Sequence, residues 1–355
     1  MAPLSGVRVL DFTIWRPGPY ATQLLCELGA DVLKVEPPTG DPMRSYPGLF
    51  AALNAGKRGI ALDLKDGGAR AEALSLAAEA DVVVESYRPG VAERLGIGAA
   101  AVRAVQPDVV YCSVSGMGQT GPLAQAPGHD LNYMAWAGAL APDGELPRVP
   151  AIPVADLSGG MAAALSVCAA LVGRARGGAG GERIDVAIGD VLATWTGAVV
   201  PEASGVDPAA RQVPGYGLFE TADGHHVALG VLTEDHFWRS LCAALGLEPG
   251  TGELGFVDRM ARSDELQSSI GATVMQRPRD ELVAALLAAD VPVAPVNTRA
   301  EMLALDHFRE RGVVGEEEWA EVATGHPVRF DHQPPQRRGR PPALGEHTGQ
   351  RFEDR

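Results

Sequence analysis

Two side chains in the middle of the sequence have the types and positions that chemistry requires. Asp156 lies in IPVADLSGGMAAAL, between a strand-like segment and a long alanine-rich helical segment, and His129 lies in APGHDLNY, at the start of another helical segment. A carboxylate and an imidazole in one site are suited to proton abstraction, and a carboxylate alone can act as a nucleophile. Both residues can equally be helix caps, so the sequence leaves a structural interpretation open.

Three groups of basic residues are expected near the carboxyl ends of the strands. They are Lys57-Arg58, Lys65 and Arg88. Ligands of open α/β sheets bind at the carboxyl ends of the strands, and arginine binds phosphate through two parallel hydrogen bonds. Each residue alone is typical of a surface charge. Together they favour a phosphate-rich ligand at this edge of the sheet.

The first half of the chain alternates short apolar runs with helical segments, and this pattern predicts parallel βαβ units with helices on both faces of a sheet. The expected strands are GVRVLDF, ADVLKVE, RGIALDL, DVVVES, DVVYCSVSG and the start of ERIDVAIGDVLATW. The expected helices span 20–28, 68–80, 91–95, 99–105 and 156–173. The first strand is followed by TIWRPGPYATQLL without GxGxxG, which argues against a nicotinamide-dependent oxidoreductase.

The character of the sequence changes after about residue 200. YGLFETADGHHVALGV predicts a β-hairpin, helices are expected over 235–245 and 279–288, and VPVAPVN is a strand candidate. These elements predict a smaller α+β domain. The proline- and arginine-rich tail HQPPQRRGRPPALGEHT is expected to be extended and to wrap the surface.

Composition narrows the functional classes. The 355-residue chain has a formal net charge of −15, which argues against a nucleic-acid partner. No uninterrupted apolar run of about 18 residues and no signal peptide is evident, so no membrane association is expected. The 4 cysteines lie far apart, which predicts neither disulfides nor a zinc site and fits a cytoplasmic location.

A series of motifs in one order gives the chain a specific resemblance. MAPLSGVRVLDF, GPYATQLLCELGADVLKVEPP, NAGKRGIALDLK, VVVESYRPGVAERLG and VSGMGQTGP resemble the N-terminal part of the family III CoA-transferases of the CaiB/BaiF type. PGHDLNY and ADLSGG are similar to the α-methylacyl-CoA racemase subgroup. FETADGHHVALG, DHFWRSLC, VPVAPVN and ALGEHT extend the resemblance to essentially the whole chain.

The resemblance implies an architecture. A large Rossmann-like domain that binds CoA is expected over residues 1–200, a small α+β domain over 201–325, and a C-terminal extension over 326–355 that returns to the large domain. Two chains are expected to interlock as a homodimer, with each active site between the large domain of one chain and the small domain of the other.

The resemblance also implies site residues. Asp156 and His129 match the racemase bases, and Glu234 in VLTEDHFW matches a glutamate that pairs with the histidine. The residues that match the CoA and acyl-CoA binding segments are Leu62, Asp63, Leu64, Lys65, Arg88, Gly128, Asp130, Leu131, Asn132 and Tyr133. No metal and no cofactor beyond the coenzyme A of the substrate are implied.

Two positions depart from the family pattern. Pro37 in KVEPP occupies the position where racemases carry an arginine that contacts the CoA phosphates, and Lys34 or Arg44 is a candidate to replace it. Arg16 in WRPGPY occupies a position where many relatives have a small residue.

Two mechanisms follow from the resemblance. In the preferred one, Asp156 and His129 stand on opposite faces of the α-carbon of a 2-methylacyl-CoA and racemise it by proton transfer, with backbone N–H groups near Gly159 and Gly160 stabilising the enolate. In the alternative, Asp156 attacks the thioester and CoA moves to a second carboxylic acid through an aspartyl-CoA intermediate. The presence of His129 is the reason for the preference.

Overall fold

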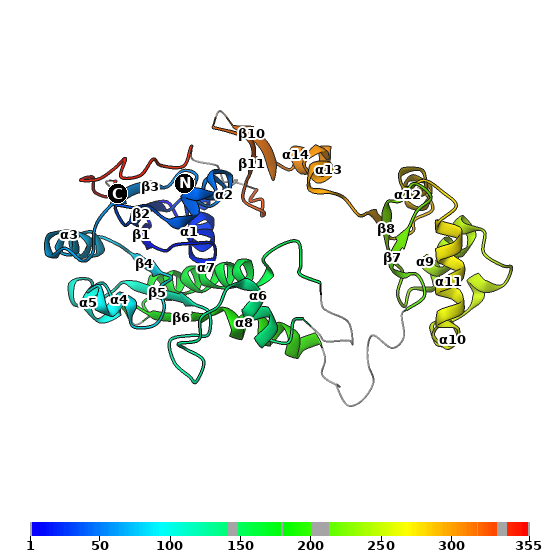
Figure 1. The fold of residues 1–355 in the computed structure, drawn as a ribbon, viewed down its shortest axis with the longest axis horizontal. Coiled ribbons are helices and arrows are strands. Elements are labelled where there is room, and N and C mark those ends of the chain that lie inside the picture. Colours follow the sequence, from blue (N-terminus) through cyan, green and yellow to red (C-terminus); the bar gives the residue numbers. More distant parts are fainter. Residues whose placement is uncertain are drawn as a thin grey trace. The chain divides into compact units, whose positions relative to one another are not determined.

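The computed structural model describes residues 2–140, 148–178, 180–199, 213–317, 319–331 and 339–353 (Figure 1). The chain divides into two compact units, one formed by residues 1–200 with 306–355 and the other by residues 201–305. Residues 306–325 therefore group with the first unit, whereas the predicted small domain extended to 325.

A six-stranded parallel sheet forms the centre of the first unit, in the order β3-β2-β1-β4-β5-β6. This arrangement confirms the predicted α/β fold. The order reverses between β1 and β4, which creates a crevice at the carboxyl ends of these two strands. The strands are β1 (Arg8–Phe12), β2 (Asp31–Glu36), β3 (Arg58–Ala61), β4 (Val82–Glu85), β5 (Val110–Ser115) and β6 (Arg183–Ala187).

Consecutive strand residues point to opposite faces of this sheet, so both faces are apolar. Helices cover both of them (Figure 1). Val9 packs into the core beneath α1, α6, α7 and α8, and Leu10 packs into the core beneath α3, α4 and α5. The helices are α1 (Pro17–Glu27), η1 (Pro42–Ser45), α2 (Pro47–Asn54), α3 (Gly67–Ala77), α4 (Val91–Arg94), α5 (Ala99–Val105), α6 (Asp130–Trp136), α7 (Val154–Ala175) and α8 (Ile188–Val199).

Helix α7 packs along α1 and carries Asp156 in its first turn. A Cβ added at Gly160 would lie 2.5 Å from the carbonyl oxygen of Pro17, so the two helices approach each other closely at this point. By length and composition alone α7 is apolar enough to cross a membrane, a property shared with many core helices. Its buried residues belong to the core of the first unit.

The second unit contains an antiparallel sheet of β7 (Tyr216–Glu220), β8 (His226–Gly230) and β9 (Val293–Pro295), which confirms the predicted hairpin and strand. Trp238 lies in its core, and its indole N–H donates to the carbonyl of Thr251 at 2.8 Å. The helices are α9 (Asp235–Leu245), η3 (Thr251–Glu253), α10 (Phe256–Ala261), α11 (Ser263–Val274), α12 (Arg279–Ala288) and α13 (Arg299–Ala304).

The C-terminal part of the chain contributes to the first unit. It forms α14 (Asp306–Glu310) and an antiparallel pair, β10 (Val314–Glu317) and β11 (Ala320–Thr324). The tail then follows the edge strand β3, where Arg58 donates to the carbonyl of Arg351 at 2.7 Å and the Gly59 N–H donates to His347 Nδ1 at 3.1 Å. Phe352 is buried in the core beneath α3, α4 and α5.

Candidate active site

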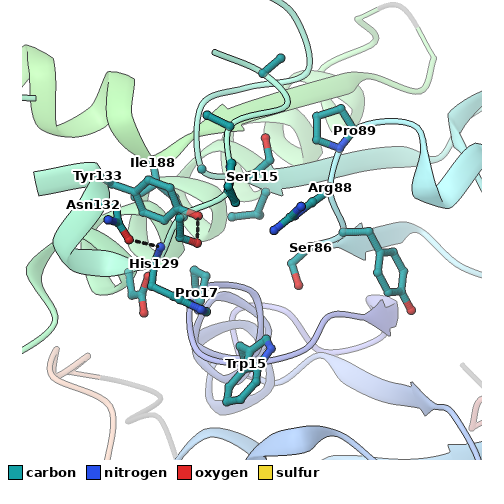
Figure 2. Close-up of a pocket in the computed structure, with 18 of the residues that line it drawn as sticks. Trp15, Pro17, Ser86, Arg88, Pro89, Ser115, His129, Asn132, Tyr133 and Ile188 are labelled. Carbon is teal, nitrogen blue, oxygen red and sulfur yellow. Dashed lines mark hydrogen bonds between the residues drawn. The ribbon is translucent and has the colours of Figure 1, made fainter. Parts of the chain in front are cut away.

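A cavity of about 570 Å³ opens at the carboxyl edge of the parallel sheet (Figure 2). Its walls come from the segments that follow β1, β4 and β5, from residues 124–133, and from the first turns of α7 and α8. This position is the crevice at the reversal of strand order, where α/β sheets bind their ligands. Asp156, His129 and Arg88 all line it.

Asp156 is partly buried beside a second carboxylate. Burial raises the pKa of Asp156 to about 6, Asp130 acts in the same direction, and the charges of Arg16 and His129 oppose the shift. The backbone N–H of Asp156 donates to Asp130 Oδ1 at 3.0 Å, which ties α6 to the first turn of α7. The result is a carboxylate that is ionised near neutral pH yet only partly solvated, as a nucleophile or base requires.

His129 is the residue that precedes α6. Its backbone N–H donates to Asn132 Oδ1 at 3.0 Å, and its ring lies edge-on to Trp15 at a centroid distance of 6.3 Å (Figure 2). The side chain is exposed and borders the same cavity as Asp156. The two residues singled out from the sequence therefore share one site.

Tyr133 forms part of the cavity wall. Its hydroxyl donates to the carbonyl of Gly128 at 2.5 Å (Figure 2). A Cβ added at Gly116 would lie 2.2 Å from the Tyr133 ring, so only glycine fits the end of β5 beside it. Gly128 and Asn132 also line the cavity, whereas Leu131 is an exposed residue outside its lining.

The segment Leu62–Lys65 lies away from the described lining of this cavity. The side chains of Leu62 and Leu64 are buried in the core. Asp63 is exposed, and its Oδ1 accepts from the backbone N–H of Lys65 at 3.1 Å. Contact of this segment with CoA stays a prediction.

The expectation for Lys57-Arg58 is wrong, because these residues lie at the amino end of β3. Lys57 is buried and pairs with Asp11 at 3.2 Å. Arg58 pairs with Asp31 at 2.6 Å. Both cations are occupied by structural partners, and neither is among the described lining residues of the cavity.

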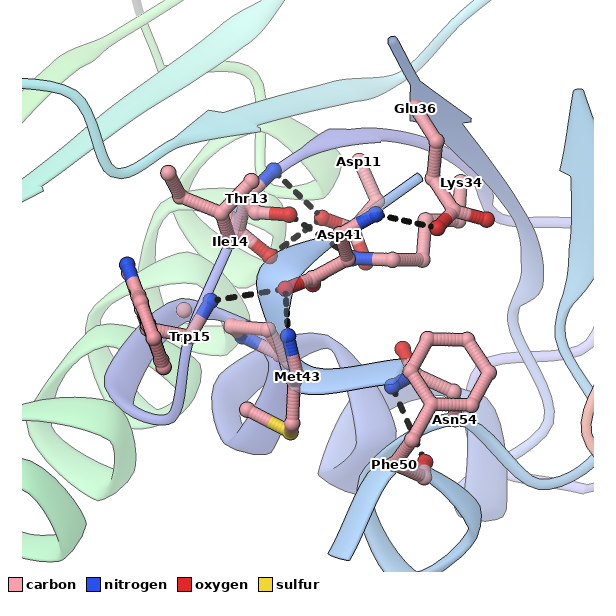
Figure 3. Close-up of polar contacts among 12 residues, drawn as sticks. Asp11, Thr13, Ile14, Trp15, Lys34, Glu36, Asp41, Met43, Phe50 and Asn54 are labelled. Atoms are coloured by element: carbon pink, nitrogen blue, oxygen red, sulfur yellow. Dashed lines mark hydrogen bonds and ion pairs between the residues drawn. The ribbon is translucent and has the colours of Figure 1, made fainter. Parts of the chain in front are cut away.

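The two candidates to replace an arginine at position 37 are also occupied. Lys34 is fully buried and pairs with Asp41 at 3.0 Å (Figure 3). Arg44 forms a two-point ion pair with Glu36, with nitrogen–oxygen distances of 2.8 and 2.6 Å. Burial excludes Lys34 from contact with CoA phosphates in this structure.

The predicted role of Gly159 and Gly160 in stabilising an enolate is wrong, because both lie beyond the first turn of α7. Helix hydrogen bonds use the N–H groups at such positions. The two glycines instead permit close packing, since a Cβ at Gly159 would lie 2.7 Å from the Ile188 side chain.

Glu234 belongs to the second unit. It precedes α9, and its Oε2 accepts from the backbone N–H of Leu232 at 3.3 Å. Its pairing with a histidine stays a prediction.

Several residues of the cavity were not singled out from the sequence. Trp15, Ser86, Ser115 and Ile188 line it. Each follows or ends a strand of the sheet, and that position was the available signal.

The comparisons with known proteins identify the family of the chain. The sequence profile described as CoA-transferase family III matches residues 4–348. The chain belongs to CoA-transferase family III. It is 33% identical to the acetyl-CoA:oxalate CoA-transferase of Acetobacter aceti, over 88% of this chain and 85% of that protein. It is also 33% identical to the succinate–glutarate CoA-transferase of Agrobacterium fabrum, over 98% and 94% of the two chains.

Two solved structures show the same fold. A CaiB/BaiF family protein from Brucella suis superposes with a TM-score of 0.85 at 30% identity and covers 98% of this chain and 97% of its own. A protein from Mycobacterium tuberculosis superposes with a TM-score of 0.86 at 30% identity, with 98% of both chains covered. Because the named relatives are CoA-transferases, the predicted racemase subgroup is not supported.

Proposed function

We propose that this family III member transfers CoA between carboxylic acids, with Asp156 as the nucleophile. One observation carries the proposal: the Asp156 carboxylate lines the cavity at the strand-order reversal, in a chain whose named relatives transfer CoA. The relatives act, by name, on oxalate, mesaconate and glutarate, which supports small carboxylic acids as the acceptors.

The proposed reaction begins when an Asp156 oxygen attacks the thioester carbonyl carbon. The carbon–sulfur bond breaks, CoA leaves as a thiolate, and a mixed anhydride remains. The thiolate then attacks the aspartyl carbonyl, which releases the donor acid and leaves CoA on Asp156 as a thioester. An acceptor carboxylate attacks the carbonyl of this thioester and displaces the CoA thiolate, which gives a second mixed anhydride. The thiolate then attacks the acceptor's carbonyl carbon, which forms the new acyl-CoA and frees Asp156.

The surroundings of Asp156 suit this sequence of steps. A carboxylate that is only partly solvated is a better nucleophile than one in bulk water, because less hydration must be removed before attack. The first turn of α7 presents backbone N–H groups that favour negative charge developing there. The reaction needs no electron acceptor, since each step exchanges one acyl bond for another.

Racemisation of a 2-methylacyl-CoA is the second candidate. His129 favours it, because its charge acts on Asp156 and its side chain borders the same cavity. In the transferase mechanism the imidazole has no essential proton to move. The two functions therefore differ in their dependence on His129.

One pair of assays separates these functions. The protein would be incubated with a panel of acyl-CoA donors and free acids, and new CoA thioesters would be followed by mass spectrometry. We expect transfer that Asp156→Ala abolishes and His129→Ala preserves within about tenfold. Deuterium incorporation at the α-carbon of a 2-methylacyl-CoA in heavy water, lost in both variants and without transfer, would instead establish racemisation.

We also retain the interlocked homodimer as part of the proposal. Met161 and Leu165 on α7 and Trp195 on α8 are at least half-exposed apolar side chains, which suits burial against a second chain. Equilibrium sedimentation would report the mass of the assembly, and a monomer at micromolar concentration would contradict this part of the proposal. A cytoplasmic location stays a prediction.

A further inference from the structure

The turn that connects β1 to α1 has an unfavourable backbone conformation. Trp15 has a φ angle of 63°, in the left-handed region that bulky residues rarely adopt. Such strain persists only where the surrounding structure holds it, and it concentrates at functional sites. Specific contacts must therefore hold this turn, and its strained conformation indicates a functional role.

The anchor is a set of buried and partly buried polar contacts, and Figure 3 shows those of Trp15, Lys34 and Asp41. The Ile14 N–H donates to Ser86 Oγ at 3.0 Å, and the Trp15 N–H donates to Asp41 Oδ1 at 3.4 Å. Lys34 pairs with Asp41 at 3.0 Å and donates to the carbonyl of Thr13 at 2.7 Å. These contacts hold the turn from both sides.

This conformation places Arg16 next to the described lining of the cavity, although Arg16 is not itself one of the lining residues. Arg16 precedes α1, and its neighbours Trp15 and Pro17 both line the cavity. Pro17 lies against Gly160, one helical turn beyond Asp156 on α7. The charge of Arg16 accordingly lowers the pKa of Asp156.

Arg16 is partly exposed, and no described carboxylate forms an ion pair with its guanidinium. Some other arginines of the first unit have such partners, such as Arg44 with Glu36. Asp130 and Asp156 already place two carboxyl groups in this part of the site. An incoming acid with an additional negative charge therefore needs a cation, and an unpaired guanidinium matches a carboxylate through two parallel hydrogen bonds.

We propose that Arg16 is a specificity-determining residue that binds the second carboxylate of a dicarboxylic acyl group or acceptor acid. This inference rests on the proposed CoA transfer. In this proposal the strained turn holds the Arg16 guanidinium beside Asp156. An acid bound to Arg16 by one carboxylate then presents its other carboxyl group to Asp156. The strained turn thereby holds Arg16 in place before the substrate binds.

The test compares succinyl-CoA with butyryl-CoA, which share a four-carbon acyl chain and differ in the terminal carboxylate. The kcat/KM for transfer would be measured for the full-length wild type, Arg16→Gln and Arg16→Lys. We expect Arg16→Gln to lower kcat/KM for succinyl-CoA at least about tenfold more than for butyryl-CoA, because a charge-assisted hydrogen-bond pair is lost. Arg16→Lys should recover part of the difference.

Arg88→Gln is the matched control, because Arg88 lines the same cavity and is predicted to contact the CoA shared by both substrates. It should lower both rates by similar factors. Equal losses for the two substrates in Arg16→Gln, or no loss, would overturn the assignment of Arg16 while leaving CoA transfer established by the wild type.

A binding measurement separates failure of this inference from failure of the proposed function. Calorimetric titration of both thioesters into Asp156→Asn and into Asp156→Asn/Arg16→Gln needs no turnover. Selective loss of succinyl-CoA affinity in the double variant supports recognition by Arg16 whatever the reaction is. Unchanged selectivity overturns it.

Discussion

At the scale of single residues, Asp156 depends on a balance of opposing influences. Burial and Asp130 disfavour its ionised form, while Arg16 and His129 favour it. The balance leaves the pKa at about 6, above the ordinary value of 3.8. The carboxylate is thus available at neutral pH without the low reactivity of a strongly paired aspartate.

This balance predicts the pH dependence of transfer. Only the ionised carboxylate can attack the thioester, and a raised pKa means that the proton is retained to higher pH. We expect kcat/KM to fall below about pH 6 rather than below the ordinary value of 3.8. Rate measurements from pH 4.5 to 8 at constant ionic strength, spanning roughly one unit and more on either side, check this limb.

Arg16→Met supplies the internal check, because it removes a permanent charge that lowers the pKa of Asp156. The acidic limb should move to higher pH in this variant. Arg103→Met, at the end of α5 and outside the described lining of the cavity, should leave the limb in place. A wild-type limb near pH 4, or one that Arg16→Met does not move, contradicts the assigned electrostatics.

At the scale of elements, the contact between α1 and α7 positions the site. Gly160 lets the two helices approach closely at Pro17, and α1 in turn begins immediately after Arg16. Any residue larger than glycine at position 160 must separate the helices or distort the turn before α1. Packing at one glycine therefore connects the fold to the geometry of the cavity.

Two glycines on α7 give a matched pair of substitutions. A Cβ at Gly160 would lie 2.5 Å from a backbone oxygen, whereas a Cβ at Gly173 would meet nothing within 4 Å. We expect Gly160→Ala to destabilise the protein by about 1–3 kcal/mol through overpacking. Gly173→Ala should stabilise α7 by about 0.5–1 kcal/mol, because alanine loses less backbone entropy.

Thermal unfolding monitored by circular dichroism checks both changes, and transfer assays report whether the site has moved. Gly160→Ala should lower the melting temperature and the activity together. A Gly160→Ala variant that melts as the wild type does, with full activity, would show that α1 and α7 can separate without consequence.

Sequence patterns predicted some of these elements and missed others. The apolar runs predicted all six strands of the parallel sheet, because buried parallel strands are continuously apolar. Helix α1 begins at Pro17 rather than at residue 20, since proline at the first helical position needs no N–H partner. The strand pair of β10 and β11 was not predicted, because these short sequences lack a clear period-two apolar pattern.

For the site, the sequence grouped Asp156 with His129 and placed Arg88 at the carboxyl edge, and all three line one cavity, but it misplaced Lys57. A lysine beside a strand gives no indication of which end of that strand it occupies or whether it is buried. Its partner Asp11 interrupts the apolar run RVLDF, and this buried acid was the signal for an internal ion pair. The strained conformation of Trp15 has no counterpart in the local sequence pattern.

At the scale of the whole molecule, the first unit is built from two distant parts of the chain. The last described residues return to β2 and β3, where the Glu353 N–H donates to Asp31 Oδ2 at 2.9 Å and Phe352 fills the core beneath α3, α4 and α5. The second unit is thus an insertion between the two parts. The tail therefore contributes to both the sheet edge and the core of the first unit.

Phe352→Ala tests the contribution of the tail. Removing a buried aromatic ring is expected to cost about 3 kcal/mol and to lower the melting temperature of the first unit by roughly 6 °C or more. Gln350→Ala changes an exposed residue of the same segment and should have no effect. Differential scanning calorimetry compares the two, and an unchanged transition in Phe352→Ala would mean that the tail does not complete this unit.

The proposed transfer requires CoA to become attached to Asp156 during turnover. Mass spectrometry of the protein after rapid quenching with a donor acyl-CoA tests it most directly, with peptide mapping to locate the adduct. We predict a mass increase that corresponds to CoA minus water on the peptide containing Asp156, absent from Asp156→Asn and still formed in His129→Ala. Steady transfer of CoA without any adduct at Asp156, or an adduct that maps to another residue, would show that Asp156 is not the nucleophile.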